Sequence, residues 1–265
     1  MSPAILVLAG RRSAAPDPLA VAGGVSHKAM VPLRGEAMVG RVLRIAETAW
    51  PDAPLFVSVD DFSAISGEPT VARLAAAGRL TPLEARSNIV ESVVEASRTT
   101  GFPLLITTAD NVLMTPEGIR SIHEEGVKTG ADAVAMMAEK QDILAAHPDG
   151  QRRFYAFRGG AYSNCNLFWL GGPQALQATE SFRLGGQFAK HKRRAVEALG
   201  LSTLLLYVSR LLTLEGMFRH FSRRFGIAIR PLVAGDGRLA IDVDNERTHR
   251  VAEEILGRDG HSGPD

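Results

Sequence analysis

The sequence predicts a three-layer α/β/α fold in which helices cover both faces of a mostly parallel central sheet. Continuous apolar runs alternate along the chain with segments of helical periodicity, which is typical of strands buried on both faces. Pro116 and Pro173 each stand where a helix would begin, a position that proline favours. Hydrophobic residues make up 45% and charged residues 22% of the 265 residues, enough for a substantial core.

The apolar runs define the elements in chain order. The expected strands are Ile5–Leu8, Leu55–Val59, Leu104–Thr107, Ala133–Met137, Asn166–Leu170 and Ile227–Val233. The expected helices are Met38–Ala49, Ile89–Ser97, Pro116–Thr129, Pro173–Thr179 and Thr248–Leu256. No internal repeat interrupts this alternation, so residues 1–265 are expected to form a single domain.

Two regions break the alternation. Residues 11–27 are rich in Ala, Gly and Pro and predict a mobile loop. Lys190–Arg224 is basic and leucine-rich and predicts a helical insert at about 186–225. The last residues, Gly257–Asp265, are expected to form a frayed polar tail.

Charge and composition exclude several classes of protein. The formal net charge is +1, which gives no global field for nucleic acid. The single Cys165 cannot form an internal disulfide, and its nearest sequence neighbours include no histidine that would activate it. The first apolar run is too short for a secretory signal and lacks a preceding basic residue, and no run reaches membrane-spanning length. A cytoplasmic protein is expected.

An acid at the end of a predicted strand is the clearest functional signal. Asp110 follows the run Phe102–Ile106, and Thr115-Pro116-Glu117 then opens a helix. Ligands of open α/β sheets bind at the carboxyl ends of the strands, and a carboxylate there is suited to a divalent cation. The alternative is an aspartate that only caps a turn or helix.

The loop after the first strand carries a second signal. Leu8, Ala9 and Gly10 end that strand, and Lys28 lies at the far end of the following loop. A glycine at this place lets backbone amides approach phosphate closely, and a lysine can neutralise phosphoryl charge. A surface loop with a solvated lysine is the alternative.

A pair of acids near the end of the chain is the third signal. Asp242 and Asp244 are two residues apart, so on a strand they would point to the same face. The alternative is that Asp244 or Asn245 caps the last helix, and both roles are compatible.

In this order, these motifs resemble the MobA-like nucleotidyltransferase superfamily. The resemblance rests on Leu8–Gly10 followed by Lys28–Gly35, on Asp110–Glu117, and on Asp242–Glu246 before the last helix. The first loop departs from the family pattern because Arg11 and Arg12 follow Gly10 and the loop is several residues longer. The resemblance implies a Rossmann-like sheet and transfer of a nucleoside monophosphate from a nucleoside triphosphate, CTP or GTP favoured, to a phosphorylated small-molecule acceptor.

The resemblance also implies roles for particular residues. Asp110 and Asp244 would bind Mg²⁺ with Asp242 in support, and Lys28 would stabilise the charge of the reacting phosphate. The nucleotide would contact Leu8, Ala9 and Gly10, together with Ser87 and Asn88 before a helix. Ser87 or Asn88 would otherwise be an N-cap, with Glu91 completing a capping box, and for Ser87 this is the stronger interpretation. The acceptor would contact Asn164, Asn166 and Lys192, whose amides and ammonium suit hydroxyl and phosphate groups. A plain turn before a strand is the alternative for Asn164 and Asn166.

The basic leucine-rich insert leaves three interpretations open. It is a lid whose Lys190, Lys192, Arg193 and Arg194 bind the acceptor phosphate, an amphipathic face on an anionic membrane, or an ordinary core or dimer helix. In the membrane interpretation Leu204–Leu206 and Leu211–Leu214 would insert into the bilayer. The sequence does not specify the oligomeric state.

Two other functions remain as alternatives to the nucleotidyltransferase. A nucleotide-sugar-dependent glycosyltransferase would carry an Asp-x-Asp pair at the end of the mid-sheet strand, where this chain has Thr108-Ala109-Asp110. A non-catalytic nucleotide-binding regulator is favoured by the atypical Gly10-Arg11-Arg12 loop.

Overall fold

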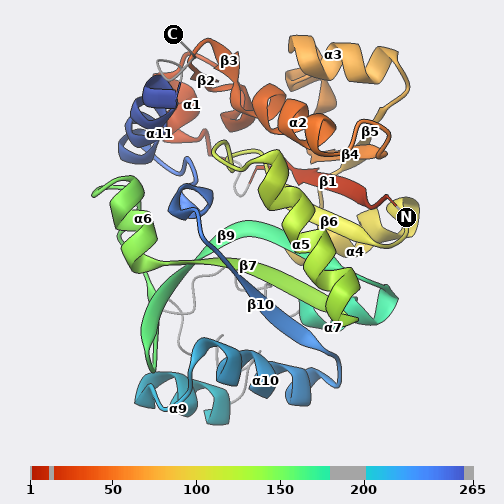
Figure 1. The fold of residues 1–265 in the computed structure, drawn as a ribbon. Helices are drawn as coiled ribbons and strands as arrows, with labels where there is room; N and C mark the ends of the chain where they lie inside the picture. Colours follow the sequence, from red (N-terminus) through yellow and green to blue (C-terminus); the bar gives the residue numbers. More distant parts are fainter. Residues whose placement is uncertain (1, 12–14, 180–200, 260–265) are drawn as a thin grey trace, which may run out of the picture.

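The computed structural model describes residues 2–11, 15–179 and 201–259, and within them a single eight-stranded sheet forms the centre of the molecule (Figure 1). Its strands lie in the order β10-β7-β9-β6-β1-β4-β5, with β8 paired to β9. Their bounds are β1 Ala4–Leu8, β4 Leu55–Val59, β5 Leu80–Glu84, β6 Leu104–Thr108, β7 Ala133–Glu139, β8 Tyr155–Phe157, β9 Gly160–Leu170 and β10 Ile229–Ala234. A separate antiparallel pair consists of β2 (Pro32–Leu33) and β3 (Glu36–Ala37).

The sheet is mostly parallel. The pairs β1–β4, β1–β6, β4–β5 and β7–β10 are parallel, whereas β9 runs antiparallel to both β6 and β7, and β8 is antiparallel to β9. The carboxyl ends of β1, β4, β5, β6, β7 and β10 therefore meet at one edge. In Figure 1, α6 (Lys140–Ala146) and α11 (Glu246–Asp259) lie at this edge.

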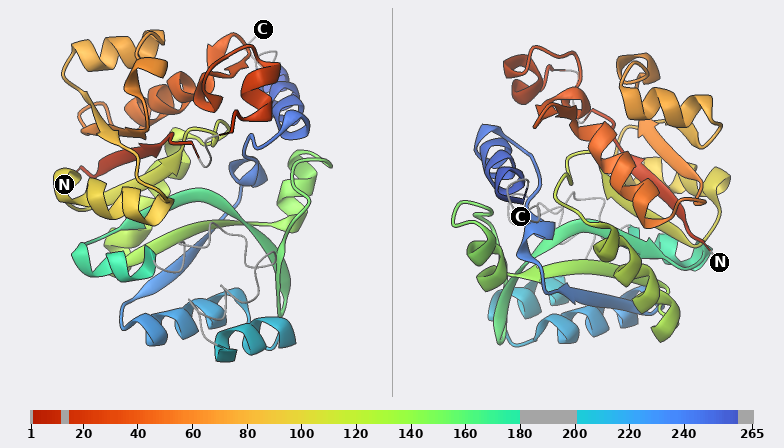
Figure 2. Two further views of the ribbon diagram at one scale, coloured as in Figure 1. Left: turned by 180° about the vertical axis from the view of Figure 1, so that it is seen from behind. Right: turned by 45° about the horizontal axis from the view of Figure 1, so that its top comes forward.

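Helices cover both faces of the sheet, as the two views of Figure 2 show. One core contains side chains of α2 (Met38–Ala49), α3 (Pro69–Ala76), α5 (Pro116–Thr129), α6 (Lys140–Ala146) and α11 (Glu246–Asp259). The opposite core contains side chains of α4 (Ile89–Thr100), the turn before α7 (Leu176–Thr179) and α10 (Leu214–Phe225). Alternate residues of β1 contribute to the two cores: Ile5 and Val7 to the first, Ala4 and Leu6 to the second.

Two helices flank the edge of the sheet that carries the predicted site. Helix α1 (Pro18–Ala22) lies within the segment expected to be a loop, because Asp17 caps it by accepting the Leu19 amide and Leu19 is buried. Helix α11 packs on the β2–β3 pair: His249 Nε2 lies 2.7 Å from the Pro32 carbonyl, and Glu253 accepts the Arg34 amide at 2.7 Å.

The prediction of an α/β fold with a mostly parallel sheet is confirmed, and all six expected strands exist. Three expectations were wrong in detail. The strand expected at Asn166–Leu170 begins at Gly160, the helix expected from Pro173 begins as a single 3₁₀ turn before α7, and the last helix extends through Asp259 rather than fraying from Gly257. Residues 260–265 of the expected tail lie outside the described residues.

Other elements were not predicted. These are β2, β3, β5, β8, α1, α3 and α6. Helices α9 (Leu201–Ser209) and α10 lie within the helical insert expected at about 186–225, of which residues 186–200 lie outside the described residues. The amino-acid sequence of β5 explains why this strand was not predicted. Thr81, Pro82 and Glu84 interrupt its apolar residues, and the strand forms an edge of the sheet. Among the described residues, no helix combines the length and hydropathy needed to cross a bilayer.

Gly237 provides a test of how tightly the site-bearing edge is packed. A Cβ at Gly237 would lie 2.2 Å from the backbone of Asp142 in α6, whereas one at Gly235 meets nothing within 4 Å. We expect Gly237→Ala to lower the free energy of unfolding by about 1–3 kcal/mol, since backbone must move to admit the methyl group. Guanidinium unfolding followed by circular dichroism measures it. Gly235→Ala is the matched control, and equal effects of the two substitutions would contradict the packing account.

Candidate functional site

Three carboxylates from two distant parts of the chain meet at the edge of the sheet where the parallel strands end. One oxygen each of Asp110, Asp242 and Asp244 lie within 4.8 Å of one another. Asp110 is buried, with 7% of its surface exposed, while Asp244 is exposed toward the solvent side of the cluster. An all-oxygen set of this kind suits a hard divalent cation such as Mg²⁺.

Asp110 is placed by the end of β6. The chain turns directly after that strand, with the Asn111 amide bonded to the Thr108 carbonyl at 3.1 Å. The Asp110 carbonyl then accepts the Val243 amide at 3.0 Å. This backbone bond joins the end of β6 to the segment between the other two acids, so the three carboxylates converge.

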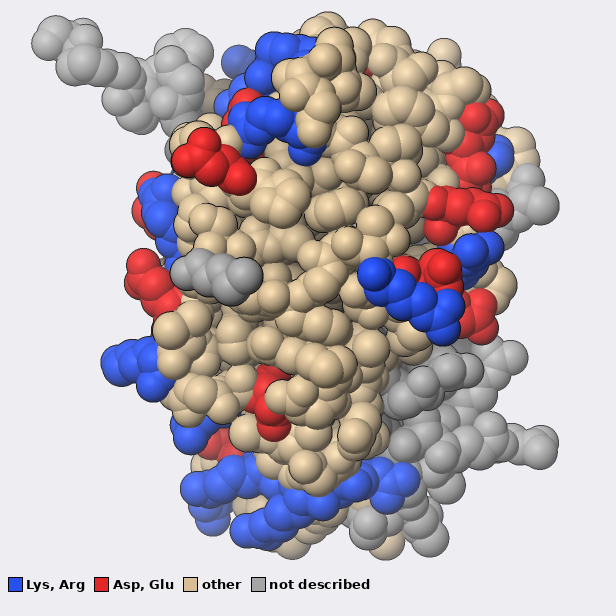
Figure 3. Space-filling model, turned by 90° about the vertical axis from the view of Figure 1, so that its right-hand side faces the viewer, with Lys and Arg blue, Asp and Glu red and all other residues tan. Residues whose placement is uncertain are grey.

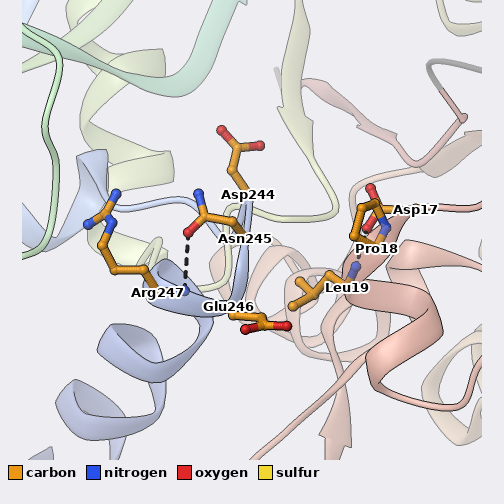
Figure 4. Close-up of a pocket in the computed structure, with 7 residues that line it drawn as sticks. All are labelled: Asp17, Pro18, Leu19, Asp244, Asn245, Glu246 and Arg247. Atoms are coloured by element: carbon orange, nitrogen blue, oxygen red, sulfur yellow. Dashed lines mark hydrogen bonds between the residues drawn. The ribbon is translucent and has the colours of Figure 1, made fainter.

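Asp242 and Asp244 lie on an irregular segment rather than on the strand that the sequence predicted. A 3₁₀ turn, Gly237–Ala240, follows β10, and the chain then runs without regular structure to α11. Asn245 caps α11: its Oδ1 accepts the amides of Arg247 and Thr248 at 3.1 and 3.2 Å. The Asp244 amide donates to Thr248 Oγ1, which leaves its carboxylate directed away from the helix (Figure 4).

Lys28 lies between two of the acids. Its Nζ is 2.7 Å from Asp110 Oδ2 and 3.4 Å from Asp244 Oδ1. The 3₁₀ turn Lys28–Met30 holds it there, because the His27 side chain accepts the Ala29 amide at the start of that turn. The structure thus brings together Lys28, Asp110 and Asp244, the three residues predicted to be catalytic.

The cluster carries more negative than positive charge. Burial in the protein raises the pKa of Asp242 well above its ordinary range, and the neighbouring carboxylates of Asp244 and Asp110 raise it further, while Lys28 acts in the opposite direction. The single ammonium of Lys28 does not balance even the two carboxylates, Asp110 and Asp244, that it contacts. The excess of negative charge therefore favours the binding of a further cation, and this excess is the observation that fits Mg²⁺ to these residues.

Asn166 and Asn164 lie beneath Asp242 within β9, not in a turn before it. Asn166 Nδ2 is 3.2 Å from Asp242 Oδ2, and Asn166 Oδ1 accepts from Asn164 Nδ2 at 3.0 Å. The register of β9 against β7 shifts at this place, and Asn166 has a positive φ of 48°. Both amides thus contact the cluster or each other, and their contact with the acceptor stays a prediction.

Asn111 supports this irregular strand from the next loop. Its side chain is buried and donates to Thr107 Oγ1 at 3.1 Å and to the Cys165 carbonyl at 2.9 Å. Cys165 itself faces the core, and burial raises the pKa of its thiol, so the structure agrees with the expectation that it is not a nucleophile.

The loop after β1 is held by residues that the sequence did not indicate. Asp60, directly after β4, accepts the backbone amide of Arg11 at 2.9 Å and pairs with its guanidinium, and His27 Nε2 lies 3.4 Å from the same carboxylate. Burial alone would raise the pKa of Asp60, but the hydrogen bonds from Arg11 outweigh it and lower that pKa. Asp60 thereby joins the two ends of the loop, and a carboxylate directly after a strand was the signal that could have identified it.

The residues predicted to contact the nucleotide lie at the same edge. Leu8 ends β1 and Ala9 follows it. A Cβ on Gly10 would lie 2.7 Å from Ala85 Cβ, so the close approach requires glycine. Asn88, not Ser87, is the N-cap of α4, because its Oδ1 accepts the Glu91 amide at 3.0 Å. The cap predicted for Ser87 was therefore wrong: its hydroxyl donates to the Glu91 side chain instead.

A cleft of about 290 Å³ opens beside Asp244 (Figure 4). Residues of α1 and the start of α11 line it: Asp17, Pro18, Leu19, Asp244, Asn245, Glu246 and Arg247. Of the three carboxylates of the cluster, Asp244 is the one that lines the cleft. Lys192, predicted to bind the acceptor, and the rest of Lys190–Arg194 lie outside the described residues.

The fold is shared with solved structures. A hypothetical transferase from Thermus thermophilus aligns with a TM-score of 0.72 and 24% identity, over 94% of this chain and 100% of its own. CMP:2-keto-3-deoxy-manno-octonic acid synthetase in complex with CTP aligns with a TM-score of 0.59 and 13% identity, over 97% and 98%. 4-Diphosphocytidyl-2C-methyl-D-erythritol synthase from Anaerococcus prevotii has a TM-score of 0.56 and 9% identity, over 96% of each chain.

These identities are low, so the likeness establishes the fold alone: an α/β architecture that these solved structures also have. No protein-family model matches the chain, and no curated protein matches it significantly.

Asp60 provides a test of how the first loop is held. We expect Asp60→Asn to speed amide exchange in residues 15–27 about fivefold to tenfold, because the loop loses its charge-assisted hydrogen bonds to Arg11 and His27. Hydrogen–deuterium exchange with mass spectrometry measures the change. Asp61→Asn is the matched control, since Asp61 bonds to Ser63 in its own turn. Unchanged amide exchange in Asp60→Asn would contradict the role of Asp60 in holding the loop.

Proposed function

We propose that this chain is a Mg²⁺-dependent nucleotidyltransferase of the MobA-like type. It would transfer a nucleoside monophosphate from a nucleoside triphosphate to a phosphorylated small-molecule acceptor and release pyrophosphate. The position of Lys28 between Asp110 and Asp244, at the carboxyl edge of the sheet, is the observation that carries the proposal. The shared fold of the two synthetases supports it at the level of architecture.

The reaction needs no protein nucleophile. An oxygen of the acceptor phosphate attacks the α-phosphorus, the bond from that phosphorus to the bridging oxygen of the β-phosphate breaks, and pyrophosphate leaves with the electron pair. The chain contributes positioning and charge neutralisation. The ammonium of Lys28 balances the negative charge that develops on the α-phosphate oxygens, and the backbone at Gly10 can approach the phosphates closely because no side chain intervenes.

The carboxylates supply the metal part of the site. Asp110, Asp242 and Asp244 would hold Mg²⁺, and Asn166 orients Asp242 through its amide. When bound, Mg²⁺ neutralises phosphate charge and fixes the relative positions of the phosphate groups. Replacing any one carboxylate removes a ligand and also changes the charge that Lys28 meets.

Among donors we propose CTP first. One of the similar structures was solved with CTP, and the name of another contains the cytidyl group. GTP remains the second donor, since the resemblance of the sequence extends to enzymes that use it.

Pyrophosphate release tests the proposal. CTP, GTP, UTP and ATP, each with and without Mg²⁺, are incubated with the protein and a panel of sugar and polyol phosphates. We expect one triphosphate to support release only with Mg²⁺, and Lys28→Ala to lower turnover about 10²–10³-fold, because a charge that stabilises the transition state is lost. Lys128→Ala, on the exposed side of α5, is the control and should leave turnover unchanged.

Two results would reject the proposal. Full activity of Lys28→Ala would remove Lys28 from the mechanism. Mg²⁺-dependent binding of a triphosphate, measured by thermal shift, without release of pyrophosphate or of a product from any acceptor would favour a nucleotide-binding regulator instead.

Asn166 provides a separate test of the metal site. Because its φ is positive, Asn166→Gly keeps the backbone conformation and removes the side-chain amide that bonds to Asp242 and Asn164. We expect Mg²⁺ or Mn²⁺ to bind about tenfold or more weakly by isothermal titration calorimetry, since the ligand loses its orienting partner. Arg210→Gly, which also replaces a residue of positive φ, is the control. Equal affinities of the two variants would show that Asn166 does not orient the ligand.

A further inference from the structure

Exposed aliphatic side chains are concentrated in one short stretch of the described chain. Leu205, Val208 and Leu211 are 61%, 68% and 63% exposed. They account for half of the six large hydrophobic residues that are exposed in the described residues. Leu205 and Val208 are three residues apart on α9, so they lie on the same side of that helix, and Leu211 follows in the turn after it. Leu214, which the sequence also suggested as exposed, is instead buried in the core.

Helix α10, the next element, has a basic outer side. Leu214, Met217 and Phe218 face the core, and Arg219 and Arg223 lie one turn apart on the exposed side, next to Arg224. Residues 201–230 contain five arginines and a single acid, Glu215, so they carry +4 of charge in a chain whose total is +1. Figure 3 shows Lys and Arg gathered at the lower end of the molecule, the end at which α10 lies in Figure 1.

The two helices form one unit with the rest of the fold. Thr203 of α9 bonds to His220 of α10 at 2.8 Å, directly beside Arg219. The Tyr207 ring packs edge-on against Tyr155 and Phe157 of β8, with ring centroids 6.5 and 6.0 Å away. The helix that carries Leu205 and Val208 is therefore held beside the helix that carries the arginines. We name Leu205, Val208, Leu211, Arg219, Arg223 and Arg224 the α9–α10 surface.

We propose that the α9–α10 surface binds the surface of an anionic lipid bilayer. Aliphatic side chains that enter the boundary of the acyl chains, beside arginines that meet anionic headgroups, form the combination that such an interface selects. A nucleic acid would match the arginines but offers nothing to three exposed aliphatic residues. A second copy of this chain would have to place the same +4 segment against itself, which charge repulsion opposes.

The arrangement leaves the carboxylate cluster accessible. The α9–α10 surface lies on the α10 side of the sheet, whereas the cleft beside Asp244 is lined by α1 and α11. Binding to a bilayer would therefore hold the protein at a membrane without covering the cleft. The proposal does not depend on the reaction catalysed at the cluster.

Sedimentation with sucrose-loaded vesicles tests it, using the full chain. Vesicles of phosphatidylcholine alone are compared with vesicles in which about a third of the lipid is phosphatidylglycerol. We expect partitioning onto the anionic vesicles only. The double variant Arg223→Glu, Arg224→Glu and the triple variant Leu205→Gln, Val208→Gln, Leu211→Gln should each partition about tenfold or more weakly.

Matched controls come from α5, on the other face of the sheet. Val127 is 63% exposed and Lys128 is exposed beside it, so Val127→Gln and Lys128→Glu make the same chemical changes away from the α9–α10 surface and should partition like the unaltered chain. Circular dichroism melts confirm that each variant folds.

Three outcomes would overturn the proposal. The protein could fail to sediment with anionic vesicles. It could bind them equally well after the aliphatic triple substitution, which would mark general attraction to polyanions. Light scattering could show a dimer that the triple variant dissociates, which would assign the surface to a second copy of the chain.

Discussion

The repulsion among Asp110, Asp242 and Asp244 is the constraint on which the rest of this site depends. Two unit charges at their spacing, within 4.8 Å, repel by about 3–4 kcal/mol at an effective dielectric constant of 20. The fold holds them together with the backbone bond from Val243 to Asp110 and with the ammonium of Lys28. Burial is the main cause of the raised pKa of Asp242, and the same repulsion from Asp244 and Asp110 adds to it. The negative charge that the fold leaves unbalanced is also what makes the cluster attract a cation.

Lys28 can act on this cluster only because two separate devices hold its segment. Asp60 ties Arg11 and His27, and His27 caps the turn that carries Lys28. On the other side, α11 packs on the β2–β3 pair that follows Lys28, through Glu253 and His249. Since α11 also follows Asp244, the lysine and the acid are positioned by one packing unit. The long first loop, in which Arg11 follows Gly10, is therefore compatible with well-defined positions of Lys28 and Asp244.

The sequence predicted most of the sheet and the residues of the cluster, because both depend on local patterns. Buried apolar runs such as Leu104–Thr107 can be recognised in the sequence of an α/β protein, and so can the acids that follow them. Long-range pairing was not visible. Nothing near Asp60 indicates that it meets Arg11 and His27, and nothing near Asn166 indicates that its amide turns toward Asp242. Helix α1 was predictable in principle from Asp17 and Pro18, an N-cap followed by proline.

The irregular part of β9 shows why these contacts escape a pattern-based prediction. A regular antiparallel strand would alternate strictly, which predicts where every side chain faces. Here the register shifts and Asn166 adopts a positive φ, a conformation that costs about 1–3 kcal/mol for a residue other than glycine. Asn164 and Asn111 donate hydrogen bonds to this part of β9, and Asp242 accepts one from Asn166, which together offset that cost. Local regularity is lost where the acids must be oriented, so the strain and the cluster occupy the same place in the fold.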